Sequence, residues 1–117
     1  MKQSEIKFTV TLNDNNVPEK IVWHSSDANK ESTSKAILIS LWDAQEKNTL
    51  RIDLWTQDMM VDEMKQFYHQ NLLSMADTLE RATGEKDAAK AMRHFAQEFG
   101  ERLNIVTKNK FYDLDKN

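Results

Sequence analysis

Residues 36–42 contain no charged side chain, and this run constrains the fold more than any other stretch of the chain. Side chains alternate between the two faces of an extended strand, so Leu38 and Trp42 lie on one face and three aliphatic residues on the other. A strand of a solvated sheet normally has one polar face, whereas both faces here are apolar. The run therefore predicts a central strand with both faces covered, and its short length disfavours a helix.

A second strand is predicted over residues 50–55, after a polar turn at residues 43–48. Its first face carries three aliphatic side chains: Leu50, Ile52 and Leu54. Its other face is mixed, because Arg51, Asp53 and Trp55 share it. The two segments together predict a hairpin.

The chain before this hairpin shows a period of two. Residues 6–12 alternate apolar and polar side chains, which is typical of a strand with one buried face. A turn is expected over residues 13–18, where Asn, Asp and Pro cluster. Residues 21–23 are expected to form a short returning strand near an edge, and the polar residues 25–34 an exposed, mobile loop.

After Trp55 the period changes to 3.6, which predicts a first helix of about 22 residues. Its apolar stripe is Val61, Met64, Tyr68, Leu72, Met75, Leu79 and Ala82. Thr56 or Asp58 is expected to cap its start, and Thr83 with Gly84 fits its end.

A second helix is predicted from Glu85 onward. Its apolar stripe is Ala88, Met92, Phe95, Phe99 and Leu103, flanked by Ala89 and Ala96. Gly100 either ends this helix or weakens its last turn by about 1 kcal/mol relative to Ala. In the polar C-terminal tail, residues 108–117, the candidate anchors are Phe111, Tyr112 and Leu114.

This order predicts an α+β fold: a four-stranded antiparallel meander followed by two amphipathic helices packed on one face. Residues 1–107 are expected to form a single domain. With the helices on one face, the second face of the central strand needs another cover. Leu38, Trp42 and Trp55 form the candidate interaction surface there, for another protein or for a second copy in a homo-oligomer. The alternative is that these side chains are buried within the monomer.

The composition excludes several classes of function. A net charge of −3 without any basic run argues against nucleic-acid binding. No segment resembles a secretory signal or a transmembrane span, and no cysteine is present, which together favour a cytoplasmic location. The three histidines lack the spacing of a zinc site, and the serines lack a glycine-rich elbow. We therefore expect no catalytic residue, no metal and no cofactor.

Three stretches carry a resemblance to a known family: SEIKFTVTLNDNNVPEKIVW at 4–23, ISLWDAQEKNTLRIDLWTQDMMVDEMKQFYHQ at 39–70, and MADTLERATGE at 75–85. The chain resembles the gliding motility protein GldC family of Bacteroidota. The resemblance implies a small cytoplasmic accessory protein of a gliding machinery that is coupled to type IX secretion, with another gliding-motility protein as its partner. It supplies no catalytic motif.

A second interpretation rests on fold analogy alone. Four antiparallel strands followed by two helices is also the order in SecB export chaperones, whose oligomers hold unfolded clients in apolar grooves. On this alternative, the chain is a holdase for unfolded or secreted clients.

Overall fold

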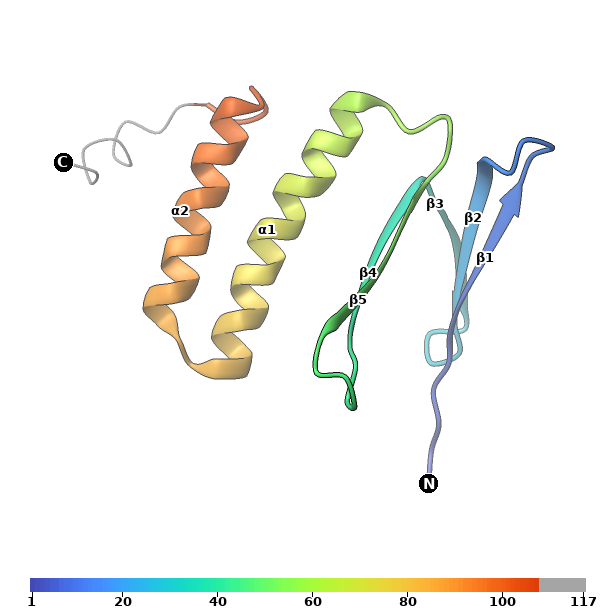
Figure 1. The fold of residues 1–117 in the computed structure, drawn as a ribbon, viewed down its shortest axis with the longest axis horizontal. Helices are drawn as coiled ribbons and strands as arrows, with labels where there is room; N and C mark the ends of the chain where they lie inside the picture. The colour runs from blue at the N-terminus through green and yellow to red at the C-terminus, as the bar shows by residue number, and fades with distance from the viewer. Residues whose placement is uncertain (108–117) are drawn as a thin grey trace. The chain divides into compact units, whose positions relative to one another are not determined.

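The structure is a computed structural model that describes residues 1–107 of the chain. The described residues form five strands and two helices (Figure 1). Their bounds are β1 Ile6–Leu12, β2 Pro18–Ser25, β3 Lys30–Ser34, β4 Ala36–Trp42, β5 Thr49–Trp55, α1 Val61–Thr83 and α2 Lys86–Arg102. The chain divides into two compact units at Met59 and Met60, and each is described by itself. The expected anchors of the C-terminal tail lie outside the described residues.

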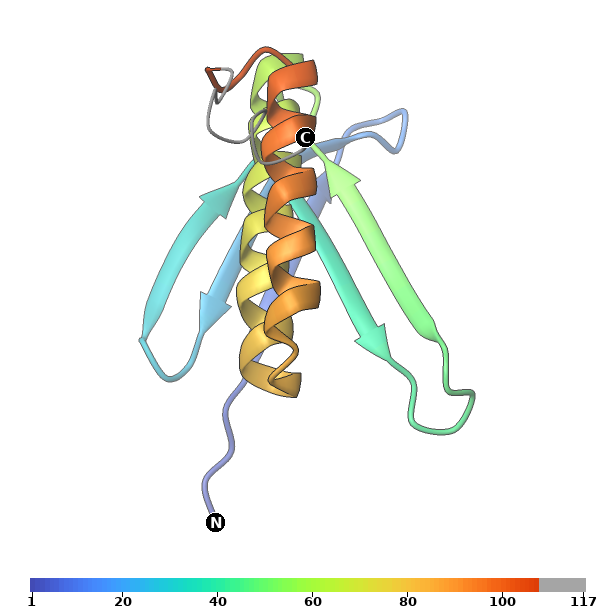
Figure 2. The same ribbon diagram turned by 90° about the vertical axis from the view of Figure 1, so that its left-hand side faces the viewer.

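The first unit contains two antiparallel sheets, one of three strands (β1–β2–β3) and one of two (β4–β5). The α+β class is confirmed, but the single four-stranded meander is wrong. The sheets separate at Lys35, the one residue between β3 and β4, where the chain bends. The carbonyl oxygen of Lys35 accepts hydrogen bonds from the backbone N–H of Thr56 at 2.8 Å and from its hydroxyl at 3.1 Å. In Figure 2, β3 and β4 extend in different directions.

The second strand was expected to be short and near an edge, but β2 has eight residues and is the central strand of its sheet. It pairs with β1 on one side and β3 on the other. Ile21, in the middle of β2, is completely buried. The predicted strand was too short because Pro18, Glu19 and Lys20 look like the end of a turn in the sequence. In the structure these three residues begin β2, and Pro18 and Lys20 pair with the end of β1.

The expected mobile loop at 25–34 is also wrong, because residues 30–34 form β3. Backbone groups make strand pairs, so a strand needs few apolar side chains when it lies at an edge. Asn29 has φ 45°, in the left-handed region that Asn tolerates, and it turns the chain back toward β2. The charged residues Lys30 and Glu31 then lie on an exposed edge strand, where charge discourages further pairing.

The first helix begins at Val61, so the two residues expected to cap it lie too far before its start. Thr56 is buried against Lys35 and hydrogen-bonds Asp58, so neither residue caps α1. Met60 stands at the N-cap position, and its N–H donates to the Glu63 side chain at 2.9 Å. The end at Thr83 and Gly84 is confirmed: Gly84 has φ 75°, a conformation that costs glycine little.

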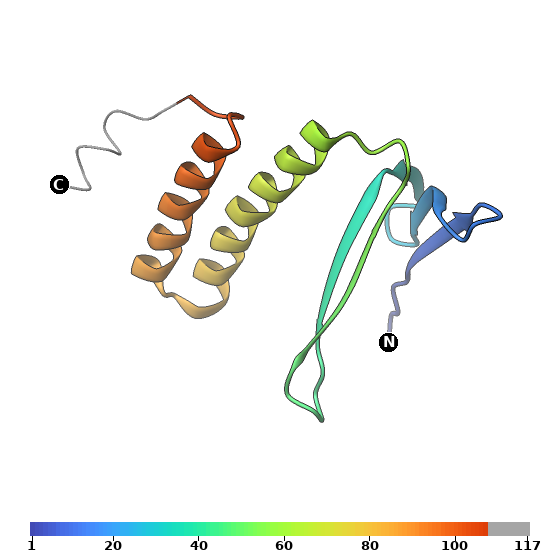
Figure 3. The ribbon, with the colours of Figure 1, turned by 45° about the horizontal axis from the view of Figure 1, so that its top comes forward.

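The two helices of the second unit pack antiparallel through small residues (Figure 3). Their buried residues are Ala76 on α1 and Ala89, Ala96 and Gly100 on α2. Gly100 does not end α2, which continues to Arg102. None of the large apolar residues of the two predicted stripes is buried, and Tyr68, Met75 and Phe95 are each about half exposed. Packing of these stripes on a sheet face stays a prediction.

No helix within residues 1–107 combines the length and the hydropathy that a membrane crossing requires.

Candidate functional site

The strand register of the β4–β5 hairpin places all three predicted surface residues on one face. Residues directly opposite in an antiparallel pair share a face, and Ala36 pairs with Trp55, Leu38 with Asp53 and Trp42 with Thr49. We call this side the tryptophan face: Ala36, Leu38, Ser40 and Trp42 of β4 with Thr49, Arg51, Asp53 and Trp55 of β5. The alternation of side chains expected for each strand is thus confirmed. The expectation that residues 36–42 form a central strand with both faces covered is wrong: within residues 1–107, β4 pairs with β5 alone, and Leu41 and Trp42, on opposite faces, are each more than half exposed.

The two indoles lie at opposite ends of this face. Trp42 is 70% exposed beside the hairpin turn, and Trp55 is 55% exposed at the other end. Because Trp55 is opposite Ala36, six residues from Trp42, the indoles are separated by roughly 20 Å along the hairpin. Leu38 lies between them and is half-buried. The structure therefore places the three residues on one elongated surface without joining them into one pocket.

A polar network occupies the middle of the tryptophan face. The Arg51 guanidinium donates to the Ser40 hydroxyl at 2.7 Å and to a carboxylate oxygen of Asp53 at 3.0 Å. Arg51 and Asp53 are both substantially exposed, so their ion pair adds little to stability. Its effect is to hold a guanidinium and a carboxylate in a defined geometry between the two tryptophans.

The opposite side of the hairpin, the aliphatic face, consists of Ile37, Ile39, Leu41, Leu50, Ile52 and Leu54. Ile37 is buried, whereas about half of the side chain of Leu41, Leu50 and Ile52 is exposed. The alternation was visible in the sequence, but this face was not among the predicted candidate surfaces. Six aliphatic residues at a spacing of two, three on each strand, are the signal that could have found it.

A polar pocket of about 330 Å³ lies at the junction of the two sheets in the first unit. It is lined by Glu19, Lys20, Ile21, Thr33, Ser34, Lys35, Thr56 and Asp58. The Thr56 hydroxyl lowers the pKa of Asp58 below its ordinary value of 3.8, and the backbone and Lys35 add to this effect against the opposing cost of desolvation. A carboxylate kept ionised in this way is poorly suited to act as a general acid at neutral pH.

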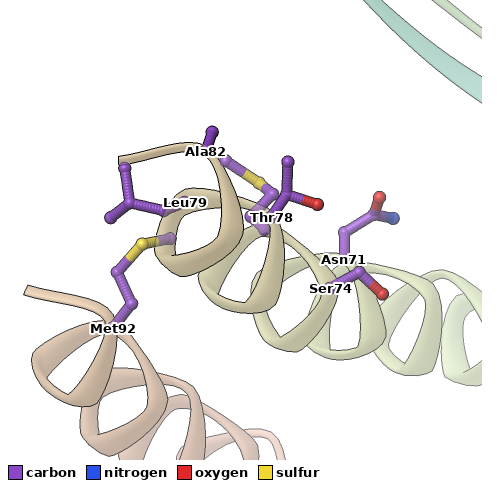
Figure 4. Close-up of a pocket in the computed structure, with 7 residues that line it drawn as sticks. Asn71, Ser74, Thr78, Leu79, Ala82 and Met92 are labelled. Carbon is purple, nitrogen blue, oxygen red and sulfur yellow. The ribbon is translucent and has the colours of Figure 1, made fainter. Parts of the chain in front are cut away.

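A second pocket, of about 460 Å³, lies along α1 in the second unit and is bordered by Met92 of α2 (Figure 4). It is lined by Asn71, Ser74, Met75, Thr78, Leu79, Ala82 and Met92. In Figure 4, the side chain of Met92 on α2 extends toward Leu79 on α1. No lining residue is titratable, so these side chains offer apolar contact and no acid–base chemistry.

The histidines are dispersed rather than clustered. His24 pairs across the sheet with Glu31, and His69 on α1 lies over Gly100 of α2. Among residues 1–107, no three His, Cys, Asp or Glu side chains are grouped closely enough to hold a metal ion.

One charged cluster joins the helices. Arg93 on α2 pairs with Asp77 at 2.8 Å and with Glu80 at 3.0 Å, both on α1. Hydrogen bonds to Asp77 and Glu80 raise the pKa of Arg93, which keeps its guanidinium charged. The cluster thus links α2 to α1 through two salt bridges.

Comparison with protein families gave a match. The model of a family described as "Gliding motility-associated protein GldC-like" matches residues 18–105, which include β2 to β5 and both helices. Comparison with curated proteins and with solved structures found no match.

Proposed function

The chain belongs to the GldC-like family of gliding motility-associated proteins, and from this premise we propose that it is a non-enzymatic accessory protein of the gliding machinery that acts by binding another protein of that machinery. We further propose a cytoplasmic location and a link to type IX secretion, as the resemblance to the GldC family of Bacteroidota implies.

The observation that carries the proposal is the composition of the tryptophan face. Trp42 and Trp55 are exposed at its two ends, and Arg51 lies between them. Tryptophan and arginine are the residue types most enriched among the few that dominate binding energy at protein interfaces. Ser40, Arg51 and Asp53 provide donors and acceptors that fix the orientation of a partner. The face therefore combines apolar anchors with directional polar groups.

A pull-down from a gliding host tests this proposal. The variant carries Trp42→Ala and Trp55→Ala together, and its folding is checked by circular dichroism. We expect the wild-type chain to retain a component of the gliding machinery and the variant to lose at least nine-tenths of it. The matched control carries Leu41→Ala and Leu50→Ala, which removes similarly exposed side chains from the aliphatic face of the same hairpin. A folded tryptophan variant that retains every partner would refute the proposal.

The aliphatic face favours a second candidate function, a SecB-like holdase. Its exposed residues Leu41, Leu50 and Ile52 form a continuous apolar row, and such a row suits an unfolded segment of no particular sequence. A holdase slows the aggregation of unrelated clients without ATP, and the Leu41→Ala, Leu50→Ala variant would weaken that effect. A dedicated partner protein has no effect on such clients. The same pair of variants therefore separates the two functions.

A further inference from the structure

The β4–β5 hairpin is an incomplete sheet. Within residues 1–107, β5 pairs only with β4, so its outer edge has no neighbouring strand. A two-stranded sheet is marginally stable in water unless a third strand or a packed face supports it. Every residue of β5 except Leu54 is exposed, and its seven residues form a long, regular edge without a bulge. Such an edge is a template for another strand.

Hydrogen bonds at the two ends of the hairpin show which backbone groups face that edge. The N–H of Asp43 donates to the carbonyl of Asn48, and the N–H of Thr56 donates to the carbonyl of Lys35. Hydrogen-bonded pairs alternate along an antiparallel ladder, so Leu50, Ile52 and Leu54 direct their backbone groups toward β4. The backbone groups that point outward are those of Thr49, Arg51, Asp53 and Trp55.

The order of side chains along this edge is self-complementary. When two β5 strands run antiparallel about a two-fold axis at Ile52, Arg51 lies opposite the partner's Asp53 and Asp53 opposite the partner's Arg51. This register brings outward-pointing residues into hydrogen-bonded pairs, as an antiparallel ladder requires. On the aliphatic face, Ile52 meets the partner's Ile52 and Leu50 meets the partner's Leu54. A shift of two residues would break both charge pairs.

The other edges are less suited to a second copy. The edge of β3 carries Lys30 and Glu31 in a short polar strand, which discourages pairing. The ladder of β1 ends in a register shift at Thr11 and Leu12, which interrupts a regular edge. Residues 36–42 of β4 have no charge to fix a register. β5 alone among the described strands combines a regular edge with paired charges that select one alignment.

We propose that β5 is the interface of a homodimer, in which β5 of two copies pair antiparallel about Ile52 and form a continuous four-stranded sheet, β4–β5–β5–β4. The inference is independent of the proposed function, because it rests on backbone pairing and charge at the edge rather than on the tryptophan side chains or the family.

Single cysteines test the register, since the natural chain has none. Ile52 faces the partner's Ile52 in a non-hydrogen-bonded pair, where Cα atoms are about 4.5 Å apart, within the range of a disulfide. Leu50 is the matched control: it is 51% exposed, compared with 49% for Ile52, and lies on the same face. Two copies of residue 50 would be about 14 Å apart, four residues along the strand, which is too far for a disulfide.

Under mild oxidation of the dilute protein, we expect Ile52→Cys to form a disulfide-linked dimer at least tenfold faster than Leu50→Cys. Equal rates, or no link in either variant, would overturn the proposed register. Folding of both variants is checked by circular dichroism before oxidation.

Charge exchange tests the interface itself. Wild-type protein should have twice the 13.7 kDa chain mass in light scattering. Arg51→Asp and Asp53→Arg each place like charges opposite one another, so each variant alone should be a monomer at concentrations where the wild type is a dimer. An equimolar mixture of the two should regain the dimer, because every charge pair is then restored. The control, Glu31→Lys on the β3 edge, should stay dimeric.

A monomeric wild type, or a dimer that both variants leave unchanged, would refute the β5 interface. If the dimer persists in both variants, the two copies associate through a surface other than β5.

Discussion

Gly100 is where the helical unit is most sensitive to one added methyl group. A Cβ at this position would lie 2.9 Å from Cγ2 of Val106 and 3.0 Å from Cδ2 and Nε2 of His69. Real Cβ contacts are essentially never shorter than 3.0 Å, so Val106 must move and the His69 ring must yield. Overpacking of this kind costs about 1–3 kcal/mol. Alanine in a helix interior recovers about 1 kcal/mol relative to glycine.

Gly100→Ala should therefore lower the free energy of unfolding by as much as about 2 kcal/mol, although alanine is the better helix former. The assay is urea denaturation followed by helical circular dichroism, with an unchanged slope showing that only stability has changed.

The control places the same substitution in a background that carries His69→Ala and Val106→Ala. The atoms that the new methyl group would strike are then absent, so Gly100→Ala should stabilise this background by about 1 kcal/mol through helix propensity alone. The effect of Gly100→Ala on the free energy of unfolding should therefore change sign between the two backgrounds. An equal effect of Gly100→Ala in both backgrounds, or stabilisation of the wild type, would show that Gly100 is not a packing requirement.

Two further predictions concern Thr56 and Asp58 at the junction of the two sheets. Thr56→Val keeps the shape of a side chain that is 2% exposed but removes its hydrogen bonds to Lys35 and Asp58, so we expect a loss of about 1–2 kcal/mol in the free energy of unfolding, measured by urea denaturation. The second concerns pH: because the pKa of folded Asp58 is lowered below 3.8, its ionised form contributes stability that is complete above pH 3.8 and is lost as the pH falls through the folded pKa. Asp58→Asn should therefore flatten the fall in denaturation midpoint between pH 5 and pH 3, and a variant curve parallel to the wild type would contradict this.

The periods of two and 3.6 predicted most of the secondary structure, because they depend on local alternation. Both faces of the β4–β5 hairpin and the end of α1 at Gly84 were predicted from such patterns. The split into two sheets was not, since it depends on one bend at Lys35 and on Thr56, a buried hydroxyl that looks like a helix cap in the sequence. β3 was not predicted because its pairing with β2 uses backbone groups, and the hydropathy of the side chains does not report on backbone pairing.

The seam between the two helices was not predicted, for a different physical reason. Large apolar residues dominate a hydrophobic stripe, yet small residues allow the closest approach of two helices. Ala89, Ala96 and Gly100, spaced by seven and four residues, lie in that seam with Ala76. The spacing is visible in the sequence, but composition alone does not tell whether a helix packs through its largest or its smallest side chains.

The geometry of β5 makes the two proposals separable. The residues whose backbone groups face the outer edge, Thr49, Arg51, Asp53 and Trp55, carry their side chains on the tryptophan face. Pairing through the edge consumes backbone groups and leaves that face open, because side chains stand roughly perpendicular to a sheet. It also places Trp42, Thr49 and the partner's Trp55 in one row across the four strands. A variant that lacks both indoles should therefore fail to capture the partner but should still form the disulfide link through Ile52→Cys. If this variant forms neither the partner complex nor the disulfide-linked dimer, the indoles themselves hold the dimer together.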